Sequence, residues 1–199
     1  TFPIRYYCGI AENALIQANT QRDIVGFYSQ YQGNLFDNTR LTLGLRHDDF
    51  SNIGSRVSPR FGLVQALNQQ HSIKLIYGEA FRAPSEVELH FKNNTVLVGN
   101  QNLKPEVVTT WDLIWVGQWP NTGLSLGYFD NHFEDSIIQA EFSGSALQFQ
   151  NRDQDPSKGF EFELRHELDN HWLLRATYTN IIEKPDLSFR EADQMGSIM

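Results

Sequence analysis

FRAPS (residues 81–85) and GNQNLKPE (residues 99–106) each border a stretch of sequence in which apolar and polar residues alternate. Alternation with a period of two is typical of a β-strand whose two faces meet different environments. Pro84 and Pro105 lack a backbone N–H, so each removes a donor where a ladder of strand hydrogen bonds should stop. The two segments therefore predict neighbouring strands of a hairpin joined by one long loop, residues 83–105.

The same alternation recurs along most of the chain, whereas the helical pattern is weak, so the sequence predicts an all-β protein. From Thr39, for example, Leu41, Leu43 and Leu45 alternate with polar or small residues. Most stretches reach about ten residues, which is what a strand tilted by about 45° needs to cross a hydrocarbon layer. We expect eight strands, at residues 24–34, 38–49, 57–67, 72–82, 106–119, 123–141, 147–168 and 171–183, with a bulge or loop near Asp153 to Ser157.

The connections and the aromatic residues favour a membrane barrel. Short turns are predicted at residues 33–38, 68–71, 120–122 and 169–170, and longer connections at 48–56, 83–105 and 141–146. Outer-membrane barrels have tight turns on the periplasmic side, long loops outside and aromatic girdles at both interfaces. Trp119 and Trp172 lie beside short turns, and Tyr31 and Phe81 lie near strand ends. The pattern predicts an antiparallel up-and-down transmembrane β-barrel segment.

Composition limits the other classes. The chain has 199 residues, 40% of them hydrophobic, and no apolar run long enough for a transmembrane helix. Its net charge of −8 argues against a nucleic-acid surface, which needs clustered Lys and Arg. The single cysteine, Cys8, has no partner for an internal disulfide. Thr1 to Arg5 lacks the basic and apolar regions of a signal peptide.

The predicted polar face carries more charge than a narrow barrel filled by its own side chains accommodates easily. Its members are Arg40, Arg46, Arg60, Lys74, Arg82, Asp112, Glu161, Glu163, Arg165 and Arg175. A wide lumen that holds water or a plug fits this face better, so we expect about eight strands of a larger barrel.

Several motifs, in order, resemble the C-terminal barrel of the bacterial TonB-dependent outer-membrane receptors. They are LTLGLRHD (41–48), SPRFGL (58–63), YGEAFRAPS (77–85), GNQNLKPE (99–106), YFDN (128–131), DSII (135–138) and KGFEFE (158–163). The resemblance covers about residues 23–182. It implies energised uptake of an iron chelate or a similar scarce nutrient across the bacterial outer membrane, with no enzyme activity and no cofactor.

The resemblance also implies a division of the chain and a set of partners. Residues 1–199 would form one partial barrel, in which 1–22 is a loop or a preceding strand, 23–183 holds the strands and 184–199 is a loop or a truncated end. The plug, the energy-coupling box and the terminal aromatic strand of the family are absent from this sequence. The expected partners are an iron–siderophore, haem or similar ligand, outer-membrane lipid, and a TonB-type periplasmic protein that acts through the missing plug.

The long loop supplies the candidate ligand-binding residues, Arg82, His90 and Phe91. Arg82 and Glu106 fall on the lumen-facing side at the outer rim, where we expect an ion pair across the hairpin. Haem receptors are similar in placing a histidine between the two boxes. Neutral imidazole binds iron, and Phe91 is placed to stack on a porphyrin. Siderophore and cobalamin receptors share the boxes, so the ligand stays open.

Other functions remain as alternatives. A passive porin or a small structural barrel would keep the same strands, and a soluble secreted β-sandwich would bury the face of Trp111, Trp115 and Trp119. A membrane hydrolase would need a nucleophile and a base, for which Ser85 and His90 are the nearby pair. His47 beside Asp48 and Asp49 is more simply a solvated loop than a catalytic dyad. Asp153-Gln154-Asp155 is followed by Pro156 and lacks the glutamate of a calcium loop. We therefore expect neither catalytic residues nor metal ligands.

Overall fold

The computed structural model describes residues 22–92, 96–143, 146–168 and 171–183. The described residues form one short helix, α1 (Glu86–His90), and nine strands. The strands are β1 (Ile24–Phe36), β2 (Thr39–Phe50), β3 (Gly54–Ala66), β4 (His71–Arg82), β5 (Leu97–Val98), β6 (Glu106–Trp119), β7 (Thr122–Ser143), β8 (Ala146–Glu167) and β9 (Leu173–Glu183). No helix among these residues is long and apolar enough to span a membrane.

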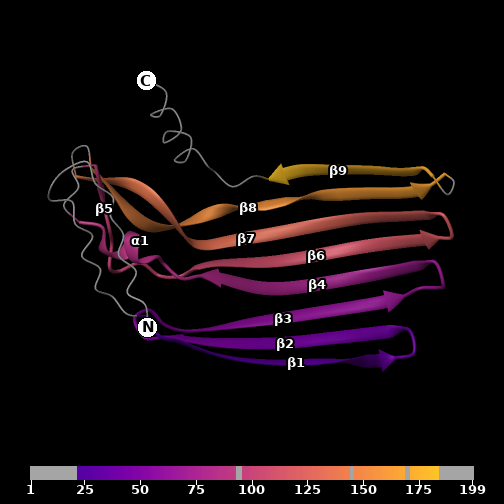
Figure 1. The fold of residues 1–199 in the computed structure, drawn as a ribbon, viewed down its shortest axis with the longest axis horizontal. Coiled ribbons are helices and arrows are strands. Elements are labelled where there is room, and N and C mark those ends of the chain that lie inside the picture. Colours follow the sequence, from indigo (N-terminus) through magenta and orange to yellow (C-terminus); the bar gives the residue numbers. More distant parts are fainter. Residues whose placement is uncertain (1–21, 93–95, 144–145, 169–170, 184–199) are drawn as a thin grey trace, which may run out of the picture.

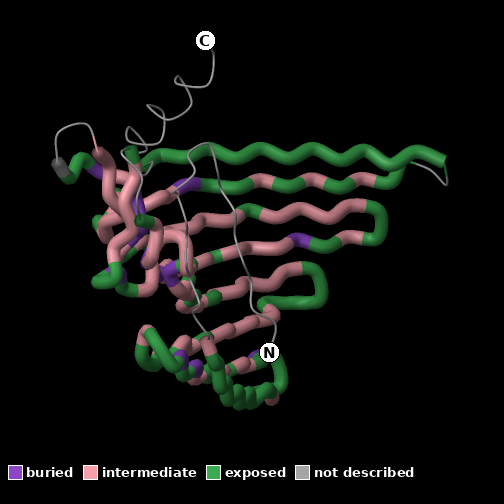
Figure 2. The backbone as a smooth tube through the Cα atoms, turned by 60° about the vertical axis from the view of Figure 1, so that its left-hand side comes forward, coloured by how far each residue is buried: buried purple, intermediate pink, exposed green. Residues whose placement is uncertain are grey.

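The eight long strands form one antiparallel up-and-down sheet, in the order β1-β2-β3-β4-β6-β7-β8-β9. Figure 1 shows them as a single curved layer, with the connections β1–β2, β3–β4, β6–β7 and β8–β9 at one end. At the other end lie α1, β5 and the tips of β7 and β8, and β5 runs parallel to β8. The predicted all-β, up-and-down fold is confirmed. Within the described residues the sheet stays open, and Figure 2 shows its edge strand β9 exposed along its length.

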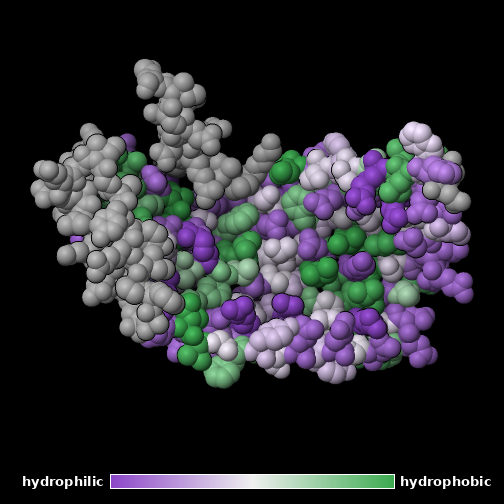
Figure 3. All heavy atoms as spheres, in the orientation of Figure 1, coloured by the Kyte–Doolittle hydropathy of each residue, from purple (hydrophilic) through white to green (hydrophobic). Residues whose placement is uncertain are grey.

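The register separates an apolar face from a polar one, because directly paired residues share a face of the sheet. Leu43 pairs with Phe61 and Phe61 with Tyr77, whereas their neighbours Arg60 and Gly78 pair on the opposite face. The apolar face includes Leu41, Leu43, Leu45, Phe61, Leu75, Tyr77, Trp111, Leu113, Leu126, Tyr128, Phe160 and Phe162. All ten charged residues predicted to face the lumen lie on the other side. Figure 3 shows hydrophilic residues spread along the strands between hydrophobic ones.

The length of the apolar face can be measured along β4. On β4 the residues of this face run from His71 through Ile73, Leu75 and Tyr77, and the next residue on the same face is the charged Glu79. That span is about 26 Å along the strand. A strand of this length tilted by about 40° would rise by roughly 20 Å, compared with the apolar band of about 25 Å in outer-membrane barrels. Aromatic rings lie at both ends of this stretch. The His71 ring lies 5.4 Å from Trp115 and 5.3 Å from the predicted Trp119 near the short turns. Near the opposite end, the Tyr77 ring lies 4.6 Å from Trp111, a pair that was not predicted.

Two of the predicted long connections are wrong. β2 continues to Phe50 and β3 begins at Gly54, so residues 51–53 alone join them. β7 reaches Ser143 and β8 begins at Ala146, so this pair is a long hairpin rather than a long loop. The eight long strands are confirmed, but α1 and β5 were not predicted. The predictions for residues 1–21, including Cys8, and for residues 184–199 fall outside the described residues.

The predicted irregularity in the seventh long strand is confirmed. The β7–β8 register shifts between Asn131 and Phe133 and again between Phe133 and Ser136. Asp135, within the second shift, has a φ of 51°, which is uncommon for a residue with a Cβ. Bulges of this kind bend a strand and re-aim its side chains. Here the irregularity lies where β7 and β8 continue past the rest of the sheet.

Candidate ligand-facing rim

Two segments build the rim at the end of the sheet opposite the short turns (Figure 1). One is the strap, defined here as the described residues 83–92 and 96–105. The other is the outer hairpin, residues 135–143 and 146–153, which extends past the last β6–β7 pair at Glu134. The strap begins as a helix because Ser85 forms a capping box with Glu88: each side chain bonds the backbone N–H of the other residue.

Arg82 connects the strap to the sheet. Its two terminal nitrogens donate to Glu88 at 2.9 Å each, and its Nε donates to Glu106. Glu106 also accepts from the backbone N–H of Ile137 at 2.5 Å, so three strands and α1 meet at this cluster. Burial raises the pKa of Glu88, but the hydrogen bonds from Arg82 and Ser85 outweigh it and hold the pKa below its usual value. The predicted Arg82–Glu106 ion pair is confirmed, and Glu88 is a member that the sequence reading missed.

The strap is bonded to the outer hairpin by two asparagines. Asn100 donates from its side chain to the carbonyl of Phe149 at 3.0 Å. Asn151 accepts from the N–H of Lys104 at 2.8 Å and donates to the carbonyls of Lys104 and Asp135 at 3.0 and 2.6 Å. The parallel β5–β8 pairing adds a backbone ladder beside them.

A small apolar core lies under these bonds. Leu89 and Leu103 of the strap and Ile137 of the outer hairpin are buried together, with the half-buried Phe149 packed against them. Burying a side chain of this size stabilises by about 1.5–3 kcal/mol. The strap is therefore packed on the hairpin by apolar contacts as well as by hydrogen bonds.

Arg22 fastens the strap on its other side. Its guanidinium donates to the carbonyl of Pro84 at 2.8 Å, forms an ion pair with Glu86 at 2.9 Å and donates to Asn52 at 3.1 Å. Because Arg22 directly precedes β1 and Asn52 lies between β2 and β3, these bonds join the strap to the opposite part of the rim. The strap thus crosses the rim between two attachments.

His90 and Phe91 lie at the end of α1. The His90 Nε2 lies 3.5 Å from a carboxylate oxygen of Glu86, and its Nδ1 lies 3.3 Å from the amide nitrogen of Gln101. Both ring nitrogens therefore face residues of the strap itself. The Phe91 backbone accepts from the N–H of Gly99 at 2.7 Å, and its side chain is half-buried.

The exposed part of the strap presents polar groups. Gln101 and Asn102 are exposed, and Lys104 is 70% exposed, with its Nζ 3.4 Å from a carboxylate oxygen of Asp135. Amide and ammonium groups donate hydrogen bonds to ligand oxygens. Among the described residues, no three His, Cys, Asp or Glu side chains gather to hold a metal ion. The exposed amide and ammonium groups of the strap are therefore able to donate hydrogen bonds to the oxygen atoms of a ligand.

The side chains of the two candidate catalytic pairs, Ser85 with His90 and His47 with Asp48, are not hydrogen-bonded to each other in the described structure. The Ser85 hydroxyl bonds to Glu88, whereas the His90 ring contacts Glu86 and Gln101. Asp48 is bound through both carboxylate oxygens by Arg46, at 2.6 and 2.8 Å. His47 and Asp48 lie in β2, so the expected loop at this position is wrong and their side chains point to opposite faces.

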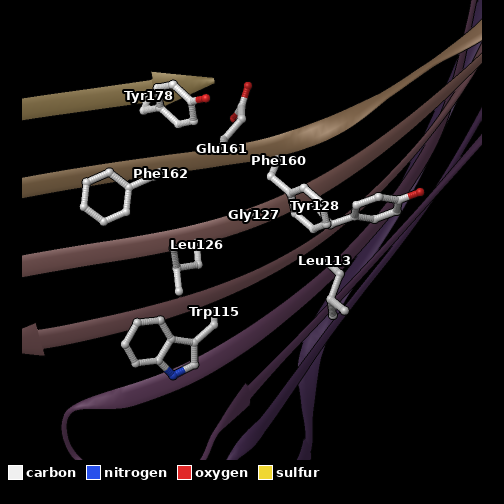
Figure 4. Close-up of a pocket in the computed structure, with 9 residues that line it drawn as sticks. All are labelled: Leu113, Trp115, Leu126, Gly127, Tyr128, Phe160, Glu161, Phe162 and Tyr178. Carbon is white, nitrogen blue, oxygen red and sulfur yellow. The ribbon is translucent and has the colours of Figure 1, made fainter. Parts of the chain in front are cut away.

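An apolar hollow of about 430 Å³ lies on the face of the sheet opposite to the charged residues. Figure 4 shows the side chains that line it. Its walls are mainly Leu113, Trp115, Leu126, Tyr128, Phe160, Phe162 and Tyr178. By register these side chains belong to the apolar face of the sheet, within the band described above. The hollow is therefore a gap between side chains on the apolar face of the sheet.

The comparisons with known proteins agree with this geometry. A family model described as TonB dependent receptor-like, beta-barrel, matches residues 2–195. The probable TonB-dependent siderophore receptor PirA of Acinetobacter baumannii is 28% identical over 130 residues, which cover 58% of this chain and 17% of that protein. The ferric enterobactin receptor PirA of Pseudomonas aeruginosa is 27% identical over 184 residues, 80% of this chain and 25% of that protein.

Solved structures share the fold. The siderophore receptor PirA from Pseudomonas aeruginosa superimposes with a TM-score of 0.75 at 26% identity, covering 83% of this chain and 33% of that one. The alcaligin outer-membrane receptor FauA from Bordetella pertussis gives a TM-score of 0.62 at 17% identity, covering 83% and 31%. The chain spans about a quarter or less of the curated relatives it matches.

Proposed function

This chain belongs to the TonB-dependent receptor-like β-barrel family, and on that premise we propose that it forms part of a receptor that imports an iron–siderophore complex. The proposal rests on the combination of two observations, the family to which the chain belongs and the exposed polar groups at the rim of its sheet. Its matched relatives are named as siderophore or ferric enterobactin receptors. Its strap offers exposed amide and ammonium donors at the outer end of the sheet, where a ligand would arrive.

The proposal includes the surroundings of this chain in the whole receptor. The apolar face of the sheet contacts outer-membrane lipid, and the polar face lines the lumen of a larger barrel. The strap and its neighbours capture the chelate outside. A TonB-type periplasmic protein then displaces a plug by using the proton gradient. The family is one of receptors and transporters, and we propose that this chain has no catalytic activity of its own.

Haem is the less favoured cargo. An axial ligand needs a free imidazole nitrogen, whereas both nitrogens of His90 face Glu86 and Gln101. Arg82 is bound by two carboxylates. We propose that Arg82, His90 and Phe91 serve the ligand mainly by holding the strap in place.

Uptake of radioactive iron tests the proposal. The full-length protein is expressed in a bacterium that lacks its own ferric enterobactin receptors, with and without the TonB-type protein. We expect saturable uptake of iron–enterobactin that disappears without the energy-coupling partner. Uptake that persists without it would indicate a passive porin. Recovery of the protein outside the membrane fraction would indicate a soluble β-sandwich.

A further inference from the structure

We propose that the strap and the outer hairpin bind the siderophore as one composite surface, and that Asn151 is the positioning residue that joins them. This inference rests on the proposed function. It differs from the simpler expectation that the loop at residues 83–105 alone decides which ligand binds. The reasons are the bonds of Asn151, the second attachment beside it and the fixed position of the strap.

Asn151 uses both ends of its amide. Its oxygen accepts from the Lys104 N–H, and its nitrogen donates to the carbonyls of Lys104 and Asp135. One side chain therefore binds the strap and the bulge of the hairpin at the same time. Aspartate would keep the acceptor but lose both donors, and alanine would lose all three bonds.

The neighbouring contacts act in the same direction. Asn100 bonds the hairpin at Phe149, and the N–H of Leu147 donates to Val96 in the strap at 2.7 Å. Ile137 is buried in one cluster with Leu89 and Leu103. A displacement of the strap away from the hairpin would break all of these contacts together. Arg22 holds the far side of the strap, so the strap has no free end that moves independently.

The exposed groups lie beside these attachments. Gln101 and Asn102 of the strap follow Asn100, and the exposed Arg152 and Asp153 of the hairpin follow Asn151. A chelate placed over the junction would therefore meet side chains from both segments. Their relative position depends on Asn151, because its bonds fix Lys104 against the hairpin. This receptor should therefore acquire the ligand choice of another receptor only when both segments are replaced by those of that receptor.

Chimeras of the full-length receptor test this directly. Residues 83–105, residues 135–153, or both are replaced by the equivalent segments of the alcaligin receptor FauA. Binding of radioactive ferric enterobactin and ferric alcaligin to whole cells is then measured. We expect the strap-only chimera to lose ferric enterobactin binding at least tenfold without gaining ferric alcaligin, and the double chimera to gain it. Equal ferric alcaligin binding by the strap-only and double chimeras would overturn the inference.

Point variants keep the test decisive if a chimera does not fold. Asn151→Ala should weaken ferric enterobactin binding about tenfold at an unchanged surface level, and hydrogen exchange should quicken in strap and hairpin together. Asn131→Ala is the matched control, because Asn131 bonds Thr110 within the sheet. Unchanged affinity in Asn151→Ala despite faster exchange would contradict the positioning role. An unmodified receptor that bound neither siderophore would defeat the proposed function, while the exchange data would still show whether the two segments move together.

Discussion

Replacement of Glu88 by alanine should loosen the strap while leaving the sheet intact. The Glu88 carboxylate accepts four hydrogen bonds, two from Arg82 and two from the backbone and hydroxyl of Ser85. A lost helix cap costs about 1 kcal/mol, and an ion pair with a half-exposed arginine contributes about 0.5–1 kcal/mol. Together they predict a loss of about 1.5–2 kcal/mol, or roughly a 10- to 30-fold rise in local opening.

Hydrogen exchange of the full-length receptor measures that opening. The N–H of Asn100 donates to the carbonyl of Glu88 at 2.8 Å, and the N–H of Leu89 donates to Ser85 at 3.1 Å, so both report on the strap. Glu88→Gln should give a smaller effect, because a neutral amide oxygen still accepts a bond. Glu163→Ala, on the sheet, is the control and should leave strap exchange unchanged. A change below about threefold in Glu88→Ala, or an equal change in β2 and β3, would show that Glu88 does not hold the strap.

Three further predictions concern the strap and the two faces. Gly99→Ala places a Cβ 2.5 Å from a backbone nitrogen of the strap, so it should destabilise the strap by about 1–3 kcal/mol. Gly78→Ala is the control, because a Cβ there meets nothing within 4 Å, and it should not change hydrogen exchange in the strap. In the folded protein the pKa of Glu88 lies below its ordinary value of 4.5. The Glu88 carboxylate therefore stabilises the strap above pH 4.5, and this stabilisation is lost as the pH falls through the lower pKa. Pepsin cleavage of the strap should rise over that pH range, and it should rise less in Glu88→Gln. Leu126→Arg on the apolar face should cost about 2–4 kcal/mol and reduce membrane insertion, whereas Ser125→Arg beside it should insert normally; equal insertion of the two variants would contradict the assignment of faces.

The sequence predicted the long strands well because one physical pattern governs them. Alternation such as that of Leu41, Leu43 and Leu45 requires one apolar and one polar face, and the register confirms both. The Arg82–Glu106 pair was predictable for a related reason. The two residues end facing strands of a hairpin, and their charges are opposite.

The rim was harder to predict because its contacts are not periodic. Ser136, Ile137 and Ile138 are buried in succession, since protein packs on both faces of the outer hairpin, and the alternation that marks a strand is lost there. Helix α1 has five residues, too few to show a helical period. Its capping box, Ser85 with Glu88, was nevertheless visible in the sequence as a Ser-x-x-Glu signal.

Long-range contacts lay beyond any local pattern. Arg22 bonds Pro84 across 62 residues, and Asn151 bonds Lys104 across 47. Nothing in the residues beside these positions specifies the partner. Such contacts arise only after the sheet has placed its strand ends along one rim, which explains why the strap was predicted as a plain loop.

Spin-label accessibility along β7 would show whether this sheet is one wall of a lipid-embedded barrel, as we propose. Nitroxide labels are placed one at a time at residues 123–128 of the full-length protein in bilayers, and collisions with oxygen and with a water-soluble nickel chelate are measured. We expect oxygen accessibility to peak at Leu124, Leu126 and Tyr128, and nickel accessibility to peak at the residues between them. Labels that are accessible to the nickel chelate on both faces, or shielded from both probes at the even positions, would contradict this proposal.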